Sequence, residues 1–89
     1  MKKVNRDYDY YISEARKAED GSHGLWKGIN QCIRSVLESQ KKAGTPLSKI
    51  PKILREIAGV KKKHTGDMVA LDNFRIVAKQ IELGKEFSV

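Results

Sequence analysis

The stretch that decides the fold is LWKGINQCIRSVLESQKKAG, residues 25–44. Its apolar residues recur every three or four positions, so they cover a single arc of a helix with about 3.6 residues per turn. Gly44 stands where a helix is expected to end, because glycine favours the left-handed backbone of a C-cap. The pattern predicts an amphipathic helix over 25–43. The residues of its apolar arc are Leu25, Trp26, Ile29, Cys32, Ile33, Val36 and Leu37.

The segments on either side repeat the helical spacing, and no sustained strand-like alternation is present. A first helix is predicted over 6–19. A third is predicted to follow Thr45, as its N-cap, and to end at Gly59. Proline lacks a backbone donor and disfavours helix at the preceding residue, so this helix begins near Pro51 or has an early turn that kinks there.

The fourth predicted helix has two apolar stripes. It is expected to begin at Asp67 or Asp72, which are both plausible caps, and to end at about Leu83. The second stripe, Val69, Ile76 and Leu83, lies about 150° from the main core face. Because a helix with two apolar sides is buried on both, this stripe is expected either beneath the first helix or against a partner. The main face comprises Ala70, Leu71, Phe74, Val77, Ala78 and Ile81.

These elements indicate an all-α fold, a small bundle of about four helices. The second to fourth helices are expected to form the core, and the last three to have a helix-turn-helix-like arrangement. With 89 residues the chain is expected to be a single helical domain over 1–89. Its ends, 1–5 and 85–89, are expected to be flexible.

Two aromatic positions raise separate questions. Trp26 lies at the edge of the apolar arc and is predicted to pack in the core, with a partly exposed stacking platform as the alternative. Tyr10 is predicted to point away from the helix face that Tyr8 and Tyr11 share.

The positive charge is concentrated in the middle of the chain. The formal net charge is +7, and residues 41–64 carry eight Lys and Arg residues against one acidic residue. Such a block favours an anionic partner, either phosphate or an acidic protein, and the alternative is a solvated lysine-rich surface. Its densest part is KKKH at 61–64, which is predicted to be a cationic turn between the third and fourth helices.

The residues predicted to contact nucleic acid surround this turn. Lysines attract phosphates and release counterions, and the N-terminus of the fourth helix adds backbone donors. Arg75 and Lys79 lie four residues apart on the face opposite the predicted core and are expected to reach toward a groove. The predicted nucleic-acid-binding residues are Lys49, Lys52, Lys61, Lys62, Lys63, His64, Arg75 and Lys79.

Residues for catalysis or metal binding have no recognisable pattern. Cys32 lies on an apolar face, where a thiol behaves as a small hydrophobe. His23 and His64 have no metal-ligand spacing with it, and no glycine-rich phosphate loop is present. We therefore expect a protein that is not an enzyme and needs no metal or cofactor. The single cysteine indicates a cytoplasmic setting, and no apolar run reaches the ~18 residues of a membrane span.

The stretch KKAGTPLSKIPKILREIAGVKKKHTGDMVALDNFRIVAKQI, residues 41–81, resembles the helix-turn-helix segments of small mobile-element proteins of phages and plasmids. These include recombinase-type DNA-binding tails and plasmid mobilisation accessory proteins. The segment after Ile57 is longer than the usual turn, and Arg55 stands where a small residue often packs. The resemblance implies DNA binding by the last helix. The matching pieces are Gly44, Leu47, Ile50 and Leu54, then Gly59 and Val60, then Phe74 to Ile81.

Three functions follow as expectations. The first is a small regulatory or accessory protein that binds nucleic acid, with DNA favoured over RNA. The second is an inhibitor of the phage or plasmid type, antirepressor or anti-sigma-like, that binds an acidic protein. The stripe Val69, Ile76 and Leu83 would be its interface, or that of a homodimer. The third is the sequestration of a small anionic nucleotide. No membrane partner is expected.

Overall fold

The structure is a computed structural model that describes residues 6–65 and 68–84, with the backbone alone for 61–65 and 68–70. Over these residues the chain forms four α-helices and one short 3-10 helix, with no strand, so the predicted all-α bundle is confirmed. The elements are α1 (Tyr8–Asp20), α2 (Gly24–Ala43), η1 (Leu47–Lys49), α3 (Ile50–Thr65) and α4 (Met68–Leu83).

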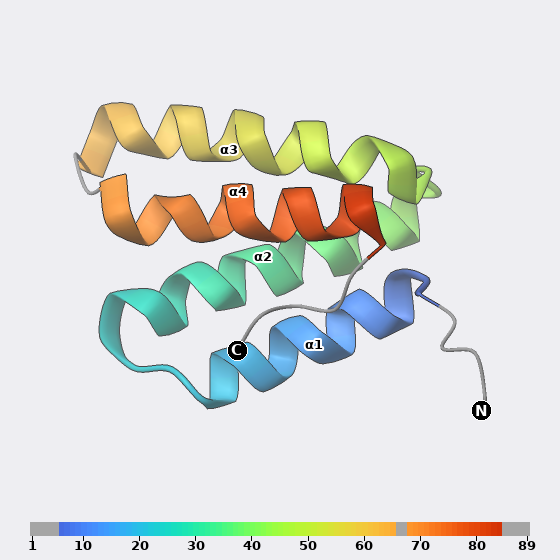
Figure 1. Ribbon diagram of the computed structural model, residues 1–89, viewed down its shortest axis with the longest axis horizontal. Helices are drawn as coiled ribbons and strands as arrows, with labels where there is room; N and C mark the ends of the chain where they lie inside the picture. The colour runs from blue at the N-terminus through green and yellow to red at the C-terminus, as the bar shows by residue number, and fades with distance from the viewer. Residues whose placement is uncertain (1–5, 66–67, 85–89) are drawn as a thin grey trace.

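The four helices pack as two antiparallel hairpins (Figure 1). The N-terminal hairpin consists of α1 and α2, and the C-terminal hairpin consists of α3 and α4. The hairpins meet mainly where α2 packs on α4. A helix-turn-helix unit crosses its helices at about 90–120°. The C-terminal hairpin instead runs its two helices side by side in opposite directions, because only residues 66–67 separate them.

The stretch KKKH at 61–64 belongs to α3, although the sequence pattern predicts a turn there. A glycine inside a helix costs only about 1 kcal/mol relative to alanine, and lysine is a good helix former. Gly59 therefore does not end α3, which continues to Thr65 while it packs along α4. The predicted cationic turn is thus the last part of a helix, and the side chains of 61–64 lie outside the described residues.

The core includes α1 as well as the three helices predicted to form it. Tyr11 and Ala15 of α1 are buried, because both turn inward toward α2 and α4. A chain of this length buries a limited share of its surface, so all four helices are needed to close one core. The other buried apolar residues are Ile29, Ile33, Leu37, Ile50, Leu54, Ala58, Leu71, Phe74, Val77, Ala78 and Ile81.

The connection between the hairpins is fixed by hydrogen bonds around Gly44. Gly44 has the left-handed φ of 80°, and the Thr45 amide donates to the Gln40 carbonyl over 3.0 Å, which confirms the predicted C-cap. Thr45 does not cap the next helix as predicted, since its Oγ1 bonds Gln40 Oε1 at 2.6 Å. The Tyr8 hydroxyl donates to the Thr45 carbonyl and so ties α1 to this connection.

The start of α3 resolves the two alternatives left open by Pro51. The 3-10 helix η1 comes first, and α3 begins at Ile50, so Pro51 occupies the first turn of the α-helix. An amide at this position has no intrahelical acceptor, so the missing N–H of proline costs nothing there. The helix therefore begins next to Pro51 and not at the Thr45–Pro46 pair.

Candidate nucleic-acid interface

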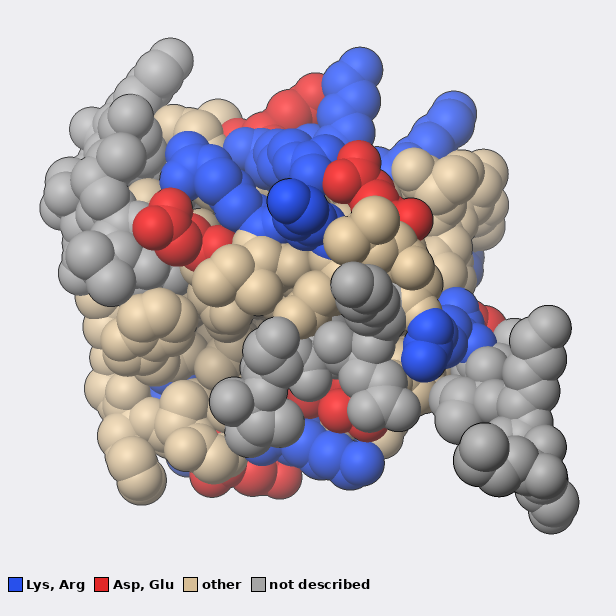
Figure 2. All heavy atoms as spheres, in the orientation of Figure 1, with Lys and Arg blue, Asp and Glu red and all other residues tan. Residues whose placement is uncertain are grey.

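Lys and Arg side chains gather over the C-terminal hairpin, with Asp and Glu side chains among them (Figure 2). Of the residues predicted to contact nucleic acid, Lys49, Lys52, Arg75 and Lys79 are exposed, as expected. The side chains of Lys61, Lys62, Lys63 and His64 lie outside the described residues. The described part of the predicted site therefore comes from η1, α3 and α4.

Two arginines of this surface are engaged with carboxylates. Arg55 of α3 donates two hydrogen bonds to Glu82 of α4, from Nη1 to Oε2 at 2.8 Å and from Nη2 to Oε1 at 2.6 Å. The hydrogen bonds from Arg55, with a smaller contribution from the charge of Lys79, hold the pKa of Glu82 below its usual value. Arg75 bonds Asp72 at 2.9 Å. Arg75, a predicted contact, is thus partly neutralised.

Three lysines remain without an ion-pair partner among the described residues. These hairpin lysines are Lys49, Lys52 and Lys79, and each is exposed. Each is a compact, strongly hydrated charge on a flexible stem, which suits contact with phosphate more than bidentate reading of a base. The hairpin lysines are the part of the predicted set that the structure leaves available to an anion.

The N-terminal hairpin differs because several of its basic side chains have carboxylate partners. Arg34 lies between Glu19, at 2.7 Å, and Glu38, at 2.9 Å, and its hydrogen bonds lower the pKa of both carboxyl groups. Lys41 pairs with Asp9 across α1 and α2, which raises the pKa of the lysine. These pairs fasten α1 to α2 and leave less of the positive charge uncompensated.

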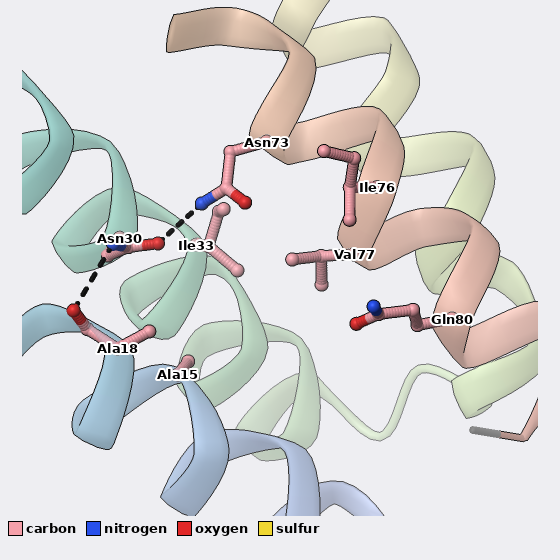
Figure 3. Close-up of a pocket in the computed structure, with 8 residues that line it drawn as sticks. All are labelled: Ala15, Ala18, Asn30, Ile33, Asn73, Ile76, Val77 and Gln80. Carbon is pink, nitrogen blue, oxygen red and sulfur yellow. Dashed lines mark hydrogen bonds between the residues drawn. The ribbon is translucent and has the colours of Figure 1, made fainter. Parts of the chain in front are cut away.

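The second apolar stripe of α4 is exposed and does not lie beneath α1. Ile76 has an exposed fraction of 47% and Leu83 of 55%, whereas the side chain of Val69 lies outside the described residues. Ile76 forms one wall of a small hollow between α1, α2 and α4 (Figure 3). The hollow measures about 20 Å³, which is room for about one water molecule and too little for a ligand.

Asn30 joins three elements at this hollow, and sequence reasoning missed it. Its side chain is 7% exposed, and Nδ2 donates to the Ala18 carbonyl at 3.3 Å and to Ser22 Oγ at 3.2 Å. Asn73 Nδ2 donates to Asn30 Oδ1, and Asn73 is half-buried (Figure 3). The signal for it was a polar residue at the edge of the apolar arc of α2, next to Leu37 around the helix.

Trp26 is 41% exposed, which contradicts its predicted place in the core. It lies in the first turn of α2, before the buried Ile29, so only part of the indole reaches the core. The indole borders a pocket of about 270 Å³, called here the Trp26 pocket. Its described lining residues are Lys17, Ala18, Gly21, Ser22, Trp26, Asn30 and Asn73.

Tyr10 also departs from its prediction. Its ring contacts the ring of Tyr11 edge to face, with 5.1 Å between centroids, and it is half-buried. Edge-to-face contact is a preferred arrangement of aromatic rings, and it draws Tyr10 toward the core that Tyr8 and Tyr11 border. Tyr10 therefore does not stand away from the protein as a stacking residue.

Within residues 6–65 and 68–84, no cluster of three or more His, Cys, Asp and Glu side chains is placed to hold a metal ion. Cys32 is a half-buried free thiol packed against the core. None of the described helices combines the length and the apolar character needed to cross a membrane. Comparison with protein-family models finds no matching family, and neither curated proteins nor solved structures give a match.

Proposed function

We propose that this protein binds nucleic acid, DNA in preference to RNA, through its C-terminal hairpin. The observation that carries the proposal is the set of exposed hairpin lysines, Lys49, Lys52 and Lys79, which form no ion pair with a carboxylate among the described residues. Lys61, Lys62 and Lys63 add positive charge to the last part of α3.

Phosphate contacts would supply most of the binding energy. Lysines that neutralise phosphates release condensed counterions, and this release favours binding without regard to base sequence. Arg55 and Arg75 would join only by exchanging Glu82 and Asp72 for phosphate. The recognition helix of a helix-turn-helix unit lies in the major groove, whereas α4 runs alongside α3, so contacts with the DNA backbone dominate this proposal over the reading of base edges.

Salt dependence tests the proposal directly. With four to six phosphate contacts, the logarithm of the association constant falls against the logarithm of salt concentration with a slope of about −4 to −5. The variant Lys52→Glu/Lys79→Glu is expected to weaken binding and to reduce that slope by about 2. Fluorescence anisotropy with labelled duplex and single-stranded DNA, and with RNA, measures both quantities.

The matched control, compared with the test variant on duplex DNA, is Lys27→Glu/Lys42→Glu. Lys27 and Lys42 are also exposed lysines without ion-pair partners among the described residues, but they belong to the N-terminal hairpin. This variant has the same net charge as the test variant, so a general loss of positive charge affects both alike. Equal weakening by the two variants would reject the C-terminal hairpin as the contact surface, and absence of binding at low salt would reject the function itself.

A second candidate function is binding of a protein partner through the exposed apolar stripe of α4. The exposure of Ile76 and Leu83 favours it, because both are large apolar side chains on one stripe of a helix. Ile76→Asp is expected to disrupt a homodimer or a complex, and Val60→Asp is the control because Val60 is an equally exposed apolar residue of α3. Light scattering that gives a monomer mass for the wild type and both variants would remove the homodimer from consideration.

A further inference from the structure

The Trp26 pocket has the size and chemistry of a site for one planar group. Its volume of about 270 Å³ lies just below the range of about 300–1,000 Å³ typical of small-molecule sites. Its lining includes the aromatic Trp26 and the polar residues Ser22 and Asn73. Aromatic surface beside hydrogen-bonding groups is the combination that holds an unpaired nucleobase.

The polar groups of the pocket are held in place. Asn73 is fixed by its bond to the buried Asn30, and Ser22 Oγ both accepts from Asn30 and donates to the Glu19 carbonyl at 3.1 Å. A base that enters would therefore meet a surface that is already arranged, which lowers the entropic cost of binding.

Two lysines at or next to the pocket offer contacts to the phosphate of a ligand. Lys17 lines it with a side chain that is 72% exposed, and its ion pair with Glu14 is long, at 3.5 Å. Lys27 follows Trp26 on α2 and has no ion-pair partner among the described residues. Asp20 is an exposed carboxylate at this end of α1, whereas the carboxylate of Glu19 is paired with Arg34. Lys17 and Lys27 are matched in number by Glu14 and Asp20, so the local charge is even, and Lys27 is the lysine here that no carboxylate pairs with among the described residues.

We propose that the Trp26 pocket receives an unpaired base of single-stranded nucleic acid, with the base stacked on Trp26 and the flanking phosphate near Lys17. This inference rests on the proposed nucleic-acid binding and adds a preference for single strands over duplexes. Stacking of a base on an aromatic side chain is tolerant of sequence and strengthens binding without base-edge reading. In a duplex the bases are already stacked on one another, so the pocket contributes nothing to duplex binding.

The fluorescence of Trp26 reports on the pocket directly, because it is the only tryptophan of the 89 residues. The full chain is titrated with oligothymidylate, and separately with the same strand paired with oligoadenylate, while tryptophan emission is recorded. We expect the single strand to quench the emission and the duplex to leave it nearly unchanged. Trp26→Ala is expected to lower single-strand affinity about tenfold, and Trp26→Phe to retain most of it. Leu25→Ala, at an exposed neighbour, is the control and is expected to bind like the wild type.

The outcomes separate the two proposals. If the single strand binds without quenching and Trp26→Ala binds it as tightly as the wild type does, the pocket plays no part, and nucleic-acid binding by the C-terminal hairpin stands. Equal quenching by strand and duplex also overturns the inference, because a paired base cannot enter. If neither binds at low salt, the proposed function itself fails. Circular dichroism shows whether Trp26→Ala is folded. If it is not, the inference is tested by the quenching of the wild type and by the single-strand affinity of Trp26→Phe.

Discussion

Replacement of Asn30 by alanine tests whether the buried amide fixes the junction of the two hairpins. The variant loses the bonds to Ala18 and Ser22 and the bond from Asn73. A typical intramolecular hydrogen bond contributes about 0.5–1.5 kcal/mol net, so the three together contribute about 3 kcal/mol. Alanine recovers roughly 0.6 kcal/mol through its higher helix propensity. The expected loss in the free energy of unfolding is therefore about 2–2.5 kcal/mol.

Urea denaturation followed by far-ultraviolet circular dichroism measures this loss. In a domain of this size it corresponds to a fall in Tm of about 8–20 °C. Gln31→Ala is the control, because Gln31 is the exposed neighbour of Asn30 on the same helix and is expected to change stability by less than about 0.5 kcal/mol.

A double-mutant cycle with Asn73→Ala isolates the bond between the hairpins. Residues in contact through one hydrogen-bond network show an interaction energy of about 0.5–3 kcal/mol, whereas independent residues are additive. We expect the double variant to be less destabilised than the sum of the two single variants. Additive losses, or an Asn30→Ala variant as stable as the control, would refute the assignment of Asn30 as the joint between α1, α2 and α4.

Two further predictions concern glycine positions and acidity. Gly44→Ala is expected to destabilise the fold by about 1 kcal/mol, because Gly44 has a φ of 80°. Gly28→Ala, inside α2 with open space around it, is expected to stabilise the fold by up to about 1 kcal/mol. Chemical denaturation that gives a change of the same sign for both variants would contradict this prediction. Because the pKa of Glu19 and Glu38 is lowered in the folded state, their contribution is complete above the ordinary carboxyl pKa near 4.3 and is lost as pH falls through the lowered value. The urea midpoint is therefore expected to hold down to about pH 5 and then fall, less steeply in Glu19→Gln; a midpoint that rises on acidification would oppose this reasoning.

Local sequence patterns predicted the helices better than their ends. The apolar arc of α2 and the C-cap at Gly44 follow from spacing and glycine chemistry, and both are confirmed. The continuation of α3 past Gly59 was not predicted, because no apolar face marks residues 61–64 and a lone glycine is an ambiguous stop signal. Packing against α4 decides that boundary, and packing is not visible in a local window.

The candidate site shows the same division between local and long-range information. Exposure of Arg75 and Lys79 followed from their place opposite the predicted core face of the fourth helix. The pair of Arg55 with Glu82 spans 27 residues of sequence and exists only because α3 and α4 are antiparallel. The exposure of Trp26 likewise depends on where the neighbouring helices end, so its apolar character predicted burial that the fold does not provide.

Pairing of helices that are adjacent along the chain has a kinetic consequence. Most inter-helix packing joins α1 to α2 and α3 to α4, and only a smaller part links the two hairpins. Contacts between near neighbours close short loops, so the ordering entropy lost before they form is small. A chain with such low contact order is expected to collapse and fold in microseconds to milliseconds, each hairpin serving as a template on which the other docks.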